Sequence, residues 1–580
     1  MIIGLDVGGT HTDVVLLDKD GLLREIKVHT DELDLFHTVL SGIEQISRGI
    51  KPKAIERLVL STTLTTNLIV QGINPDFGMI VLSGPGIDPE FFRTHEHYYV
   101  IGGALDHRGR EVTPVDLGGL KKIVKKLRRA DIRHVGVVGK FSSRNPVHEL
   151  QVRDALKKYF RKIFLGHWIS GSLNYPRRIA TTFLNASVYP IHKNFFEAVQ
   201  KTLEKHGLQV PIHILKADGG TMSFEASINY PGQTILSGPA ASVMGAIPFS
   251  GDQEEALVLD IGGTTTDMAV ILKRVPVLEP VGIEIAGFKT LIRALKTRSV
   301  GLGGDSVVKI MNGKITIGPE RKGHAMAFGG PVPTTTDALC VLNMMPEGDA
   351  AKAAAGMKML ADELDRPVVE TARAVFEHFC AEVVRHARSL VDDINSKPVY
   401  TVYEYWEGRQ IKPDKILLLG GPAACFVDQI EKVSGVKTMA VPKCAMANAL
   451  GAAFARTTCE VSLFADTERG IITAPEENYF EKISSAFTRE DAQKKALELL
   501  EQKARRSGAS RDDLEMDILE NQQFNMVRGF SAAGRNIRIK AQVRPGLVSG
   551  YQVISEKLSK EMAMMNGARQ ICSKPDGKQD

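Results

Sequence analysis

The chain has 580 residues, of which 43% are hydrophobic and 24% are charged, and a formal net charge of +5. This balance is ordinary for a globular protein and too weakly basic to favour a nucleic-acid partner, and the length predicts about three domains. No run of about 18 apolar residues and no signal-peptide pattern occurs, so we expect no membrane span. The six cysteines are scattered without a C-x-x-C pair, which favours reduced thiols and a cytoplasmic location.

Up to about residue 180, apolar strands alternate with helical segments, which indicates a layered α/β structure. A long helical region follows, and we expect Pro190 to break it. The predicted strands are 58–60, 78–82, 134–138 and 211–215, and the predicted helices are 116–130 and 175–207.

The second half of the chain mixes the same two elements. The alanine-rich stretch 349–394 is strongly helical, and the buried strand 416–419 runs into a glycine turn. After about residue 465 the character changes: Thr488 to Asp491 resembles a capping box opening a charged helix, and 536–543 alternates as a half-exposed strand. We therefore predict a small C-terminal α/β appendage at 466–580, with 573–580 frayed.

One short pattern occurs twice in the chain. The order Asp-x-Gly-Gly-Thr-x-Thr-Asp stands at 6–13 and again at 260–267, each time between two apolar runs. This is typical of a β-hairpin with a tip of glycines and hydroxyls. Paired glycines let backbone N–H groups approach a phosphate, threonine hydroxyls add donors, and an aspartate at the strand end can hold Mg²⁺ or its water shell. Two such tips facing each other would hold a polyphosphate from both sides.

Three further segments occur in a characteristic order, the first between the two hairpins and the other two after the second hairpin. They are the small-residue helix 237–246, the glycine turn 420–423 and a second small-residue helix at 445–453. Together with the hairpins they resemble the phosphate 1, connect 1, phosphate 2, adenosine and connect 2 motifs of the actin, hexokinase and heat-shock chaperone ATPase superfamily. The resemblance implies two ribonuclease-H-like lobes around a nucleotide cleft, at 1–245 and 246–465, with the helix 445–456 returning to the first lobe. ATP binding would draw the two lobes together.

A finer resemblance covers about residues 1–460. The hairpin at residues 4–13 and six other segments resemble the hydantoinase A/5-oxoprolinase family. This implies an ATP-dependent hydrolase that phosphorylates the amide oxygen of a hydantoin or lactam and so opens the ring, or, as in relatives, a carboxylase. The six other segments are 61–67, 145–149, 181–186, 237–240, 300–306 and 333–338.

The resemblance assigns roles to individual residues. Asp6 and Asp260 are expected to hold Mg²⁺ through water and to be catalytic, and Asp267 either braces its hairpin, as Asp13 does, or acts as a general base. The phosphate-binding candidates are Gly8, Gly9, Thr10, Thr12, Gly262, Gly263, Thr264 and Thr265; the nucleoside candidates are Gly303, Gly304, Gly420 and Gly421; the substrate candidates are Thr62, Thr63, Asn67, His148, Glu149 and His11.

Several of these residues also fit a structural role with no part in the reaction. His148 and Glu149 also fit a helix start with surface charge, and His11 also fits a spectator in the turn. The histidines near residues 95–107 fit no standard metal spacing, which favours exposed loop positions.

Other functions on the same fold stay open. A small-molecule kinase would need an acidic base that the sequence does not reveal, and an ATPase switch would move its lobes without turning over a small molecule. An activator of radical dehydratases would need cysteines that bridge an iron–sulfur cluster. A small-molecule substrate is expected, while a B-type partner subunit and a homo-oligomer are left open.

Overall fold

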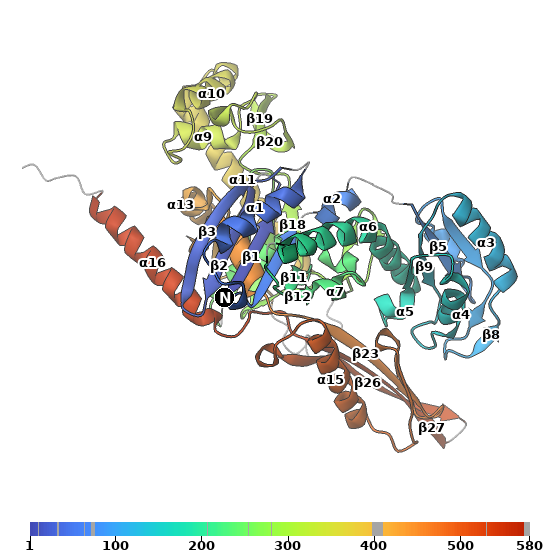
Figure 1. Cartoon of the computed structure of the whole chain (residues 1–580). Coiled ribbons are helices and arrows are strands. Elements are labelled where there is room, and N and C mark those ends of the chain that lie inside the picture. Colours follow the sequence, from blue (N-terminus) through green and yellow to red (C-terminus); the bar gives the residue numbers. More distant parts are fainter. Residues whose placement is uncertain are drawn as a thin grey trace, which may run out of the picture.

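The computed structural model describes residues 1–580 except 10, 32–33, 63, 71–75, 206, 253, 280, 397–409, 529–530 and 573–580 (Figure 1). For 67, 70, 528, 531–532 and 565–572 only the backbone is described. The candidates Thr10 and Thr63, the side chain of the candidate Asn67, and the tail 573–580 that was predicted to be frayed therefore lie outside the described part. None of the described helices is long and apolar enough to cross a membrane.

The first lobe is built on a six-stranded sheet in the order β12-β11-β4-β1-β2-β3. β1, β2 and β3 form an antiparallel meander, and β4 and β11 run parallel to β1. Antiparallel neighbours need only tight turns, whereas the parallel ones are reached through helical crossovers. The elements are β1 (Ile2–Val7), β2 (His11–Asp18), β3 (Gly21–His29), α1 (Leu35–Ser47), β4 (Arg57–Thr62), α2 (Leu64–Val70), α6 (Tyr175–Lys205), β11 (Ile212–Leu215), β12 (Thr221–Ser223) and α7 (Phe224–Ser227).

The predicted break in α6 is wrong, because the helix continues through Pro190. A proline inside a helix removes one hydrogen bond and costs about 3 kcal/mol. The helix has buried apolar side chains on both sides of this point, with Phe183 in one core cluster and Phe196 in another. Packing along the whole length therefore outweighs the local cost.

The second lobe repeats the arrangement of the first. Its sheet has the order β15-β14-β13-β21-β22, with β18 also paired to β14, and β21 and β22 run parallel to β13. The strands are β13 (Glu255–Ile261), β14 (Thr266–Leu272), β15 (Val275–Pro276), β18 (Thr297–Val300), β21 (Lys415–Leu419) and β22 (Lys437–Ala440), with the small hairpins β16 (Glu284–Ile285)–β17 (Phe288–Lys289) and β19 (Ser306–Met311)–β20 (Lys314–Arg321).

Helices cover this second sheet and extend beyond it. The stretch 349–394 predicted as one helical region is two helices, because Pro367 stands between them as the residue that precedes the second. α9 and α10 extend with β19 and β20 away from the sheet at the top of Figure 1. The helices are α9 (Thr335–Val341), α10 (Ala350–Leu364), α11 (Val368–Asn395) and α13 (Ala423–Ser434).

Two small-residue helices, α8 (Ser237–Ala246) and α14 (Ala447–Phe454), cross between the lobes. A Cβ on Gly451 would lie 2.0 Å from the carbonyl oxygen of Ala241, and one on Gly245 would lie 2.2 Å from that of Ala447. The two backbones therefore touch, which only glycine permits. Gly4 of β1 meets α14 in the same way. The helices predicted to connect the lobes are thus packed backbone to backbone at the centre of the core that both sheets share.

A second parallel sheet, β10-β9-β5-β6, is inserted between β4 and α6 and lies to one side of the lobes (Figure 1). It has its own core beneath α3 and α4. We call residues 77–174 the insertion; the sequence patterns had not separated it from the lobe predicted at 1–245. Its elements are β5 (Phe77–Leu82), β6 (Tyr98–Ile101), β7 (Ala104–Leu105), β8 (Glu111–Thr113), α3 (Leu117–Arg129), β9 (His134–Val138), α4 (Val147–Leu156), β10 (Lys162–Leu165) and α5 (Gly166–Ile169).

The C-terminal part is an antiparallel sheet in the order β25-β24-β23-β27-β26, covered by α15. The predicted capping box is confirmed, since Thr488 and Asp491 exchange their side-chain and backbone hydrogen bonds at the start of α15. The predicted domain boundary at 465 falls inside β23. The last helix, α16 (Tyr551–Cys572), packs back on β3. The other elements are β23 (Glu460–Asp466), β24 (Ile471–Ala474), β25 (Tyr479–Lys482), α15 (Arg489–Arg506), β26 (Met516–Arg528) and β27 (Ser531–Val543).

Candidate functional site

The two repeated patterns form the same turn. In the first hairpin the backbone N–H of Gly8 donates to the carbonyl of His11 over 3.0 Å, and in the second that of Gly262 donates to Thr265 over 2.9 Å. Each turn joins the first two strands of its lobe, β1 to β2 and β13 to β14. The predicted hairpins are thus at equivalent positions of the two sheets. We call residues 8–11 the first tip and 262–265 the second tip.

Asp6 lies at the end of β1, directly below the first tip, with 7% of its surface exposed. Its pKa is raised to about 7, mainly by burial and also by the nearby carboxylates of Asp13 and Asp260, while Ser61 and Asn448 oppose the rise. Its Oδ1 atom is buried without a hydrogen-bond partner. A buried carboxylate with an unpaired oxygen is stabilised when it binds a cation or a proton.

Asp260 is the counterpart of Asp6 in the second lobe, and both connecting helices bond to it. Ser242 of α8 donates to its Oδ2 over 2.6 Å, and the amide of Asn448 in α14 donates over 3.3 Å. Burial raises the pKa of Asp260 in spite of these donors. Asn448 also lowers the pKa of Asp6, so one amide acts on both aspartates across the lobes. Sequence reasoning missed Ser242 and Asn448; the signal was a polar side chain inside each run of small apolar residues.

A second pair of aspartates lies opposite the first pair in register, Asp13 against Asp6 and Asp267 against Asp260. Lys27 forms an ion pair with Asp13 over 2.5 Å, although burial still raises the pKa of this carboxyl. For Asp267 burial and the charge of Asp260 raise the pKa to about 7, opposed by the hydroxyl of Ser299. The two hairpins therefore differ in how this aspartate is neutralised.

The second tip is supported by the loop after β18. The N–H groups of Gly304 and Asp305 donate to the carbonyls of Gly262 and Gly263 over 2.9 and 2.7 Å. A Cβ on Gly303 would lie 2.5 Å from the Gly263 carbonyl oxygen, so this loop can approach only as glycine. The predicted nucleoside residues Gly303 and Gly304 are therefore packed against the tip itself. Thr264 is exposed on this tip, and Thr265 is half-buried.

The first tip is supported differently. The hydroxyl of Thr12 is buried and shares a 3.0 Å hydrogen bond with Thr30, so this predicted phosphate ligand faces the interior of its own lobe. His11 stands edge-on to His29, with ring centroids 5.8 Å apart. Burial, Lys27, His29 and His324 lower the pKa of His11. Because His324 belongs to the second lobe, its charge acts on the first tip across the space between the lobes.

Gly420 and Gly421 follow β21, the strand next to β13, and so reach the same sheet edge as the second tip. Gly420 has a φ of +99°, and a Cβ there would lie 2.1 Å from the Ile261 carbonyl oxygen. A Cβ on Gly421, in contrast, would meet no atom within 4 Å. Gly420 is thus required by the protein backbone, while Gly421 borders open space at the start of α13.

The predicted substrate residues separate into two groups. Thr62 ends β4 in register with Val7, beside the first tip, and its hydroxyl accepts from the Leu64 N–H over 3.1 Å. Its carbonyl accepts from Ser237 at the start of α8. Thr62, Asn67 by its backbone, and His11 therefore lie on the first lobe near the tips.

His148 and Glu149 belong to the insertion instead. Glu149 is fully buried and accepts from the N–H groups of Gly139 and His167 over 2.7 and 3.0 Å. Burial opposes its charge, but His167 and Arg178 lower its pKa below the ordinary value. His148 bonds to Glu111 over 2.8 Å. Both side chains therefore hold the insertion together, and the structure does not bring them to the tips.

The tips suit a magnesium ion that is shared with phosphate oxygens. Within the described part of the chain, no group of three or more His, Cys, Asp or Glu side chains is arranged to hold a metal ion. Magnesium is usually bound by one or two carboxylates, with waters and phosphate oxygens filling its other positions. The unpaired Oδ1 of Asp6 and the buried carboxylate of Asp260 fit that donor set.

Two ribonuclease-H-like sheets joined by crossing small-residue helices, each with a glycine hairpin facing the cleft, define the actin-like ATPase fold. Family models place the chain more narrowly. The hydantoinase/oxoprolinase N-terminal region matches residues 2–160, and hydantoinase/oxoprolinase matches residues 178–461. The chain belongs to the hydantoinase/oxoprolinase family.

Named relatives agree with this assignment. The chain is 22% identical to caprolactamase subunit alpha of Pseudomonas jessenii over 484 residues, which cover 76% of this chain and 68% of that one. The crystal structure of the ATP-dependent caprolactamase from that organism matches with a TM-score of 0.69 at 17% identity, over 94% of this chain and 88% of that one. A nucleotide-free acetone carboxylase structure matches over the same shares with a TM-score of 0.67 at 18% identity.

Proposed function

We propose that this protein is an ATP-dependent hydrolase that opens a cyclic amide, such as a hydantoin or lactam, by phosphorylating the amide oxygen. The observation that carries the proposal is the matched pair of tips, each with an aspartate at the end of the strand before it, where the amide of Asn448 bonds to Asp260 and lowers the pKa of Asp6. The family and the caprolactamase relative support a cyclic amide as the substrate. A cytoplasmic location, inferred from the cysteine pattern, is part of the proposal.

The two tips would hold the phosphates of ATP between them. Backbone N–H groups of Gly8, Gly9, Gly262 and Gly263 would donate to phosphate oxygens, with hydroxyls of Thr10, Thr264 and Thr265 adding donors. Thr12 and Thr30 would brace the first tip from below. Asp6 and Asp260 would hold Mg²⁺, in part through water; the ion would neutralise charge on the phosphates.

The adenosine would lie along the glycine turn after β21. Gly421 borders open space, so a base or ribose can lie directly against its backbone. Gly420, Gly303 and Gly304 would fix the second tip and the turn beside it. The nucleoside would therefore contact mainly backbone, and its position would be set by the second lobe.

The chemistry follows from the bonds involved. The C–N bond of an amide is strengthened by resonance, and its oxygen is a poor leaving group. Transfer of the terminal phosphoryl group of ATP to that oxygen releases ADP and makes the carbon electrophilic. A first water then attacks the carbon and gives up a proton to a base, and the ring C–N bond breaks as its nitrogen takes up a proton, which leaves an acyl phosphate. A second water hydrolyses the acyl phosphate to the ring-opened acid and inorganic phosphate. Asp267, with a pKa raised to about 7, is the proposed base, and Asp13 remains paired with Lys27.

The substrate would lie on the first-lobe side of the tips. Thr62, Thr63, Asn67 and His11 are the candidates there, and His148 and Glu149 are left out because they hold the insertion together. A partner subunit would share the work, since the caprolactamase relative is itself a subunit. An ATP-dependent carboxylase subunit is the second candidate, favoured by the likeness to acetone carboxylase. Self-association is left open.

A phosphate-release assay tests the proposal. The protein is incubated with Mg-ATP and one candidate substrate at a time, with and without a candidate partner subunit. The candidate substrates are hydantoin, 5-oxoproline, caprolactam, acetone with bicarbonate, and glucose. We expect release to be stimulated by a cyclic amide, with the ring-opened acid as product. Stimulation only by a ketone with bicarbonate would favour the carboxylase. A stable phosphorylated sugar would identify a kinase, and release that no compound changes would identify an ATPase switch.

A further inference from the structure

A cavity of about 550 Å³ lies away from the hairpins, where three parts of the chain meet. One wall is the insertion segment 143–144 with 170–174, the second is formed by residues 278–279, 281–282, 291 and 293 of the second lobe, and the third is the C-terminal sheet, mainly β23 and β27. No residue of either tip lines it. Its size is in the range that holds a small molecule, about 300–1,000 Å³.

Arg144 is the unusual side chain in this cavity. Only 8% of the residue is exposed, and its guanidinium stacks on Phe464 with its central carbon 3.5 Å from the ring centroid. Among the described residues it makes no ion pair, and its buried Nε has no hydrogen-bond partner. Burial lowers its pKa to about 10, as does the second arginine Arg538. A guanidinium stacked in this way keeps its N–H edge free for a planar acceptor.

The other charges of the cavity are largely matched. Glu460 pairs with Lys540 over 3.1 Å and lies 3.9 Å from Arg293. Glu279 pairs with Lys296 over 2.5 Å, and Glu520 is exposed. Arg538, like Arg144, has no acidic partner among the described residues, and its Nε is also buried and unpaired. The cavity therefore carries two neighbouring guanidinium groups in excess.

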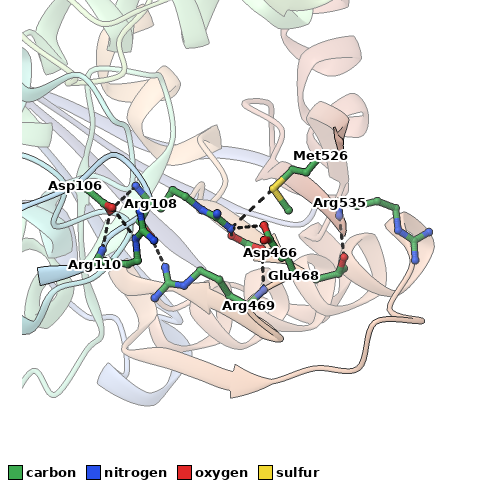
Figure 2. Close-up of polar contacts among 9 residues, drawn as sticks. Asp106, Arg108, Arg110, Asp466, Glu468, Arg469, Met526 and Arg535 are labelled. Carbon is green, nitrogen blue, oxygen red and sulfur yellow. Dashed lines mark hydrogen bonds and ion pairs between the residues drawn. The ribbon is translucent and has the colours of Figure 1, made fainter. Parts of the chain in front are cut away.

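Asp466, the acidic group that attracts Arg144, already takes part in a clasp with Arg108 (Figure 2). Arg108, on the turn between β7 and β8, pairs with Asp466 over 3.2 Å and with Glu468 over 2.7 Å, and Arg469 donates to the Arg108 carbonyl. Asp466 attracts Arg144 only at longer range. This clasp ties the insertion to the end of β23, so two walls of the cavity are held in place while Arg144 remains without a partner.

We propose that the cavity binds a small organic acid, whose carboxylate takes Arg144 and Arg538 as its partners. Two unpaired guanidinium groups side by side suit a carboxylate, which accepts two parallel N–H bonds from an arginine. Apolar side chains of Leu173, Val281 and Phe464 in the lining suit the carbon skeleton of the acid. The ligand would bridge the insertion and the C-terminal sheet. This site is separate from the proposed ATP site and does not depend on the reaction assigned to the tips.

Calorimetric titration of the full chain tests the site. The probes are succinate, glutarate and benzoate, with succinamide as a neutral match and inorganic phosphate as a different anion. We expect at least one acid to bind with a dissociation constant below about 1 mM, succinamide to bind at least tenfold more weakly, and phosphate not to displace the acid. Failure of all three acids to bind, or equal binding of succinate and succinamide, would overturn the proposal, as would phosphate that binds more tightly than every acid.

Variants separate the site from general charge. Arg144→Gln and Arg538→Gln should each weaken binding of the acid at least tenfold, and Arg144→Lys should weaken it less than Arg144→Gln. The control is Arg535→Gln on the same strand, which bonds to the Ser485 carbonyl outside the cavity and should leave binding unchanged. If Arg144→Gln fails to fold, the variant Arg538→Gln tests the proposal by itself, because Arg538 is only half-buried. Unchanged affinity in Arg538→Gln would contradict the proposal.

Discussion

The two hairpins have the same turn but different surroundings, and the contrast separates binding from chemistry. At the first, Asp13 pairs with Lys27 over 2.5 Å, so a cation is built in beside the tip. At the second, Asp267 lies beside Asp260 and the hydroxyl of Ser299, and burial with the charge of Asp260 raises its pKa to about 7. A carboxyl already matched by lysine suits support of the tip, whereas one without a cation suits proton transfer.

The backbones around the two tips differ as well. The loop at Gly303–Asp305 occupies the carbonyls of the second tip, and the Gly420 turn lies against Ile261 just before it. The first tip is joined to its lobe through side chains, with Thr12 on Thr30 and His11 beside His29. In the proposed function the second hairpin would thus fix the position of the nucleotide, and the first is the side on which the proposed substrate residues lie.

The largest effect should come from replacing Asp6 or Asp260, the aspartates at the same position of the two hairpins. Asp6→Asn and Asp260→Asn should each lower ATP turnover by at least about 10³-fold, because each removes one carboxylate from the proposed magnesium site. The amide keeps the shape of the side chain, so the thermal midpoint should not fall. Turnover and melting are measured on the same preparations. Turnover that survives one of the two changes would show that the hairpins are not equivalent.

Replacing the second pair of aspartates, Asp13 and Asp267, should have unequal effects. Asp267→Asn should lower kcat by about 10² to 10³-fold with little change in KM for ATP, as expected when a general base is lost. Asp13→Asn should cost less than about tenfold, because it removes only support of the tip. Steady-state kinetics of both variants are compared directly. Equal losses would remove the distinction between a supporting and a reacting aspartate.

The glycine turn beside the second hairpin should separate folding from nucleotide binding. Gly420→Ala would force a positive φ and a contact with the Ile261 carbonyl, and should lower the free energy of unfolding by about 2 kcal/mol. Gly421→Ala meets no protein atom and should leave stability unchanged, while weakening ATP binding about tenfold if adenosine lies there. Urea unfolding and calorimetry give the two readouts. Unchanged ATP affinity in Gly421→Ala would move the adenosine elsewhere.

The last expected effect concerns acid pH and changes stability, not turnover. Burial lowers the pKa of His192 to about 3 and that of His213 to about 4, and both residues lie in the first lobe. Between about pH 6.5 and pH 4 the unfolded chain binds these protons and the folded chain does not, so stability falls as the pH falls. Each histidine contributes about 1.4 kcal/mol per pH unit in this window.

Among the described residues of the second lobe no histidine is buried. Hydrogen exchange at pH 5 should therefore rise in β11 before it rises in β13. His213→Gln should reduce this difference. Simultaneous loss of protection in both strands would contradict it.

The sequence alone was enough to predict the features that occur twice and the close backbone contacts that require glycine. The two hairpins, the crossing helices with Gly245 and Gly451, and the turn at Gly420 follow from spacing and residue size, because no other residue fits where backbones touch. Local signals such as the capping box at Thr488 were equally readable.

Contacts between distant segments could not be predicted in this way. Asn448 reaches Asp260 across 188 positions, and Arg108 reaches Asp466 across 358. The sequence suggests a substrate-binding role for His148 and Glu149, but in the fold both side chains bond within the insertion. The same fold exposes their neighbour Arg144, which no motif had singled out, to the cavity. Side-chain direction therefore depends on tertiary packing that one sequence does not reveal.

Binding of a non-hydrolysable ATP analogue tests the central claim that both hairpins hold one Mg-nucleotide. The analogue is titrated calorimetrically into the unaltered chain, Asp6→Asn and Asp260→Asn, with and without Mg²⁺. We predict that Mg²⁺ increases affinity at least about tenfold in the unaltered chain, and that this increase disappears in each variant. An undiminished magnesium effect in either variant would contradict a site shared by the two lobes.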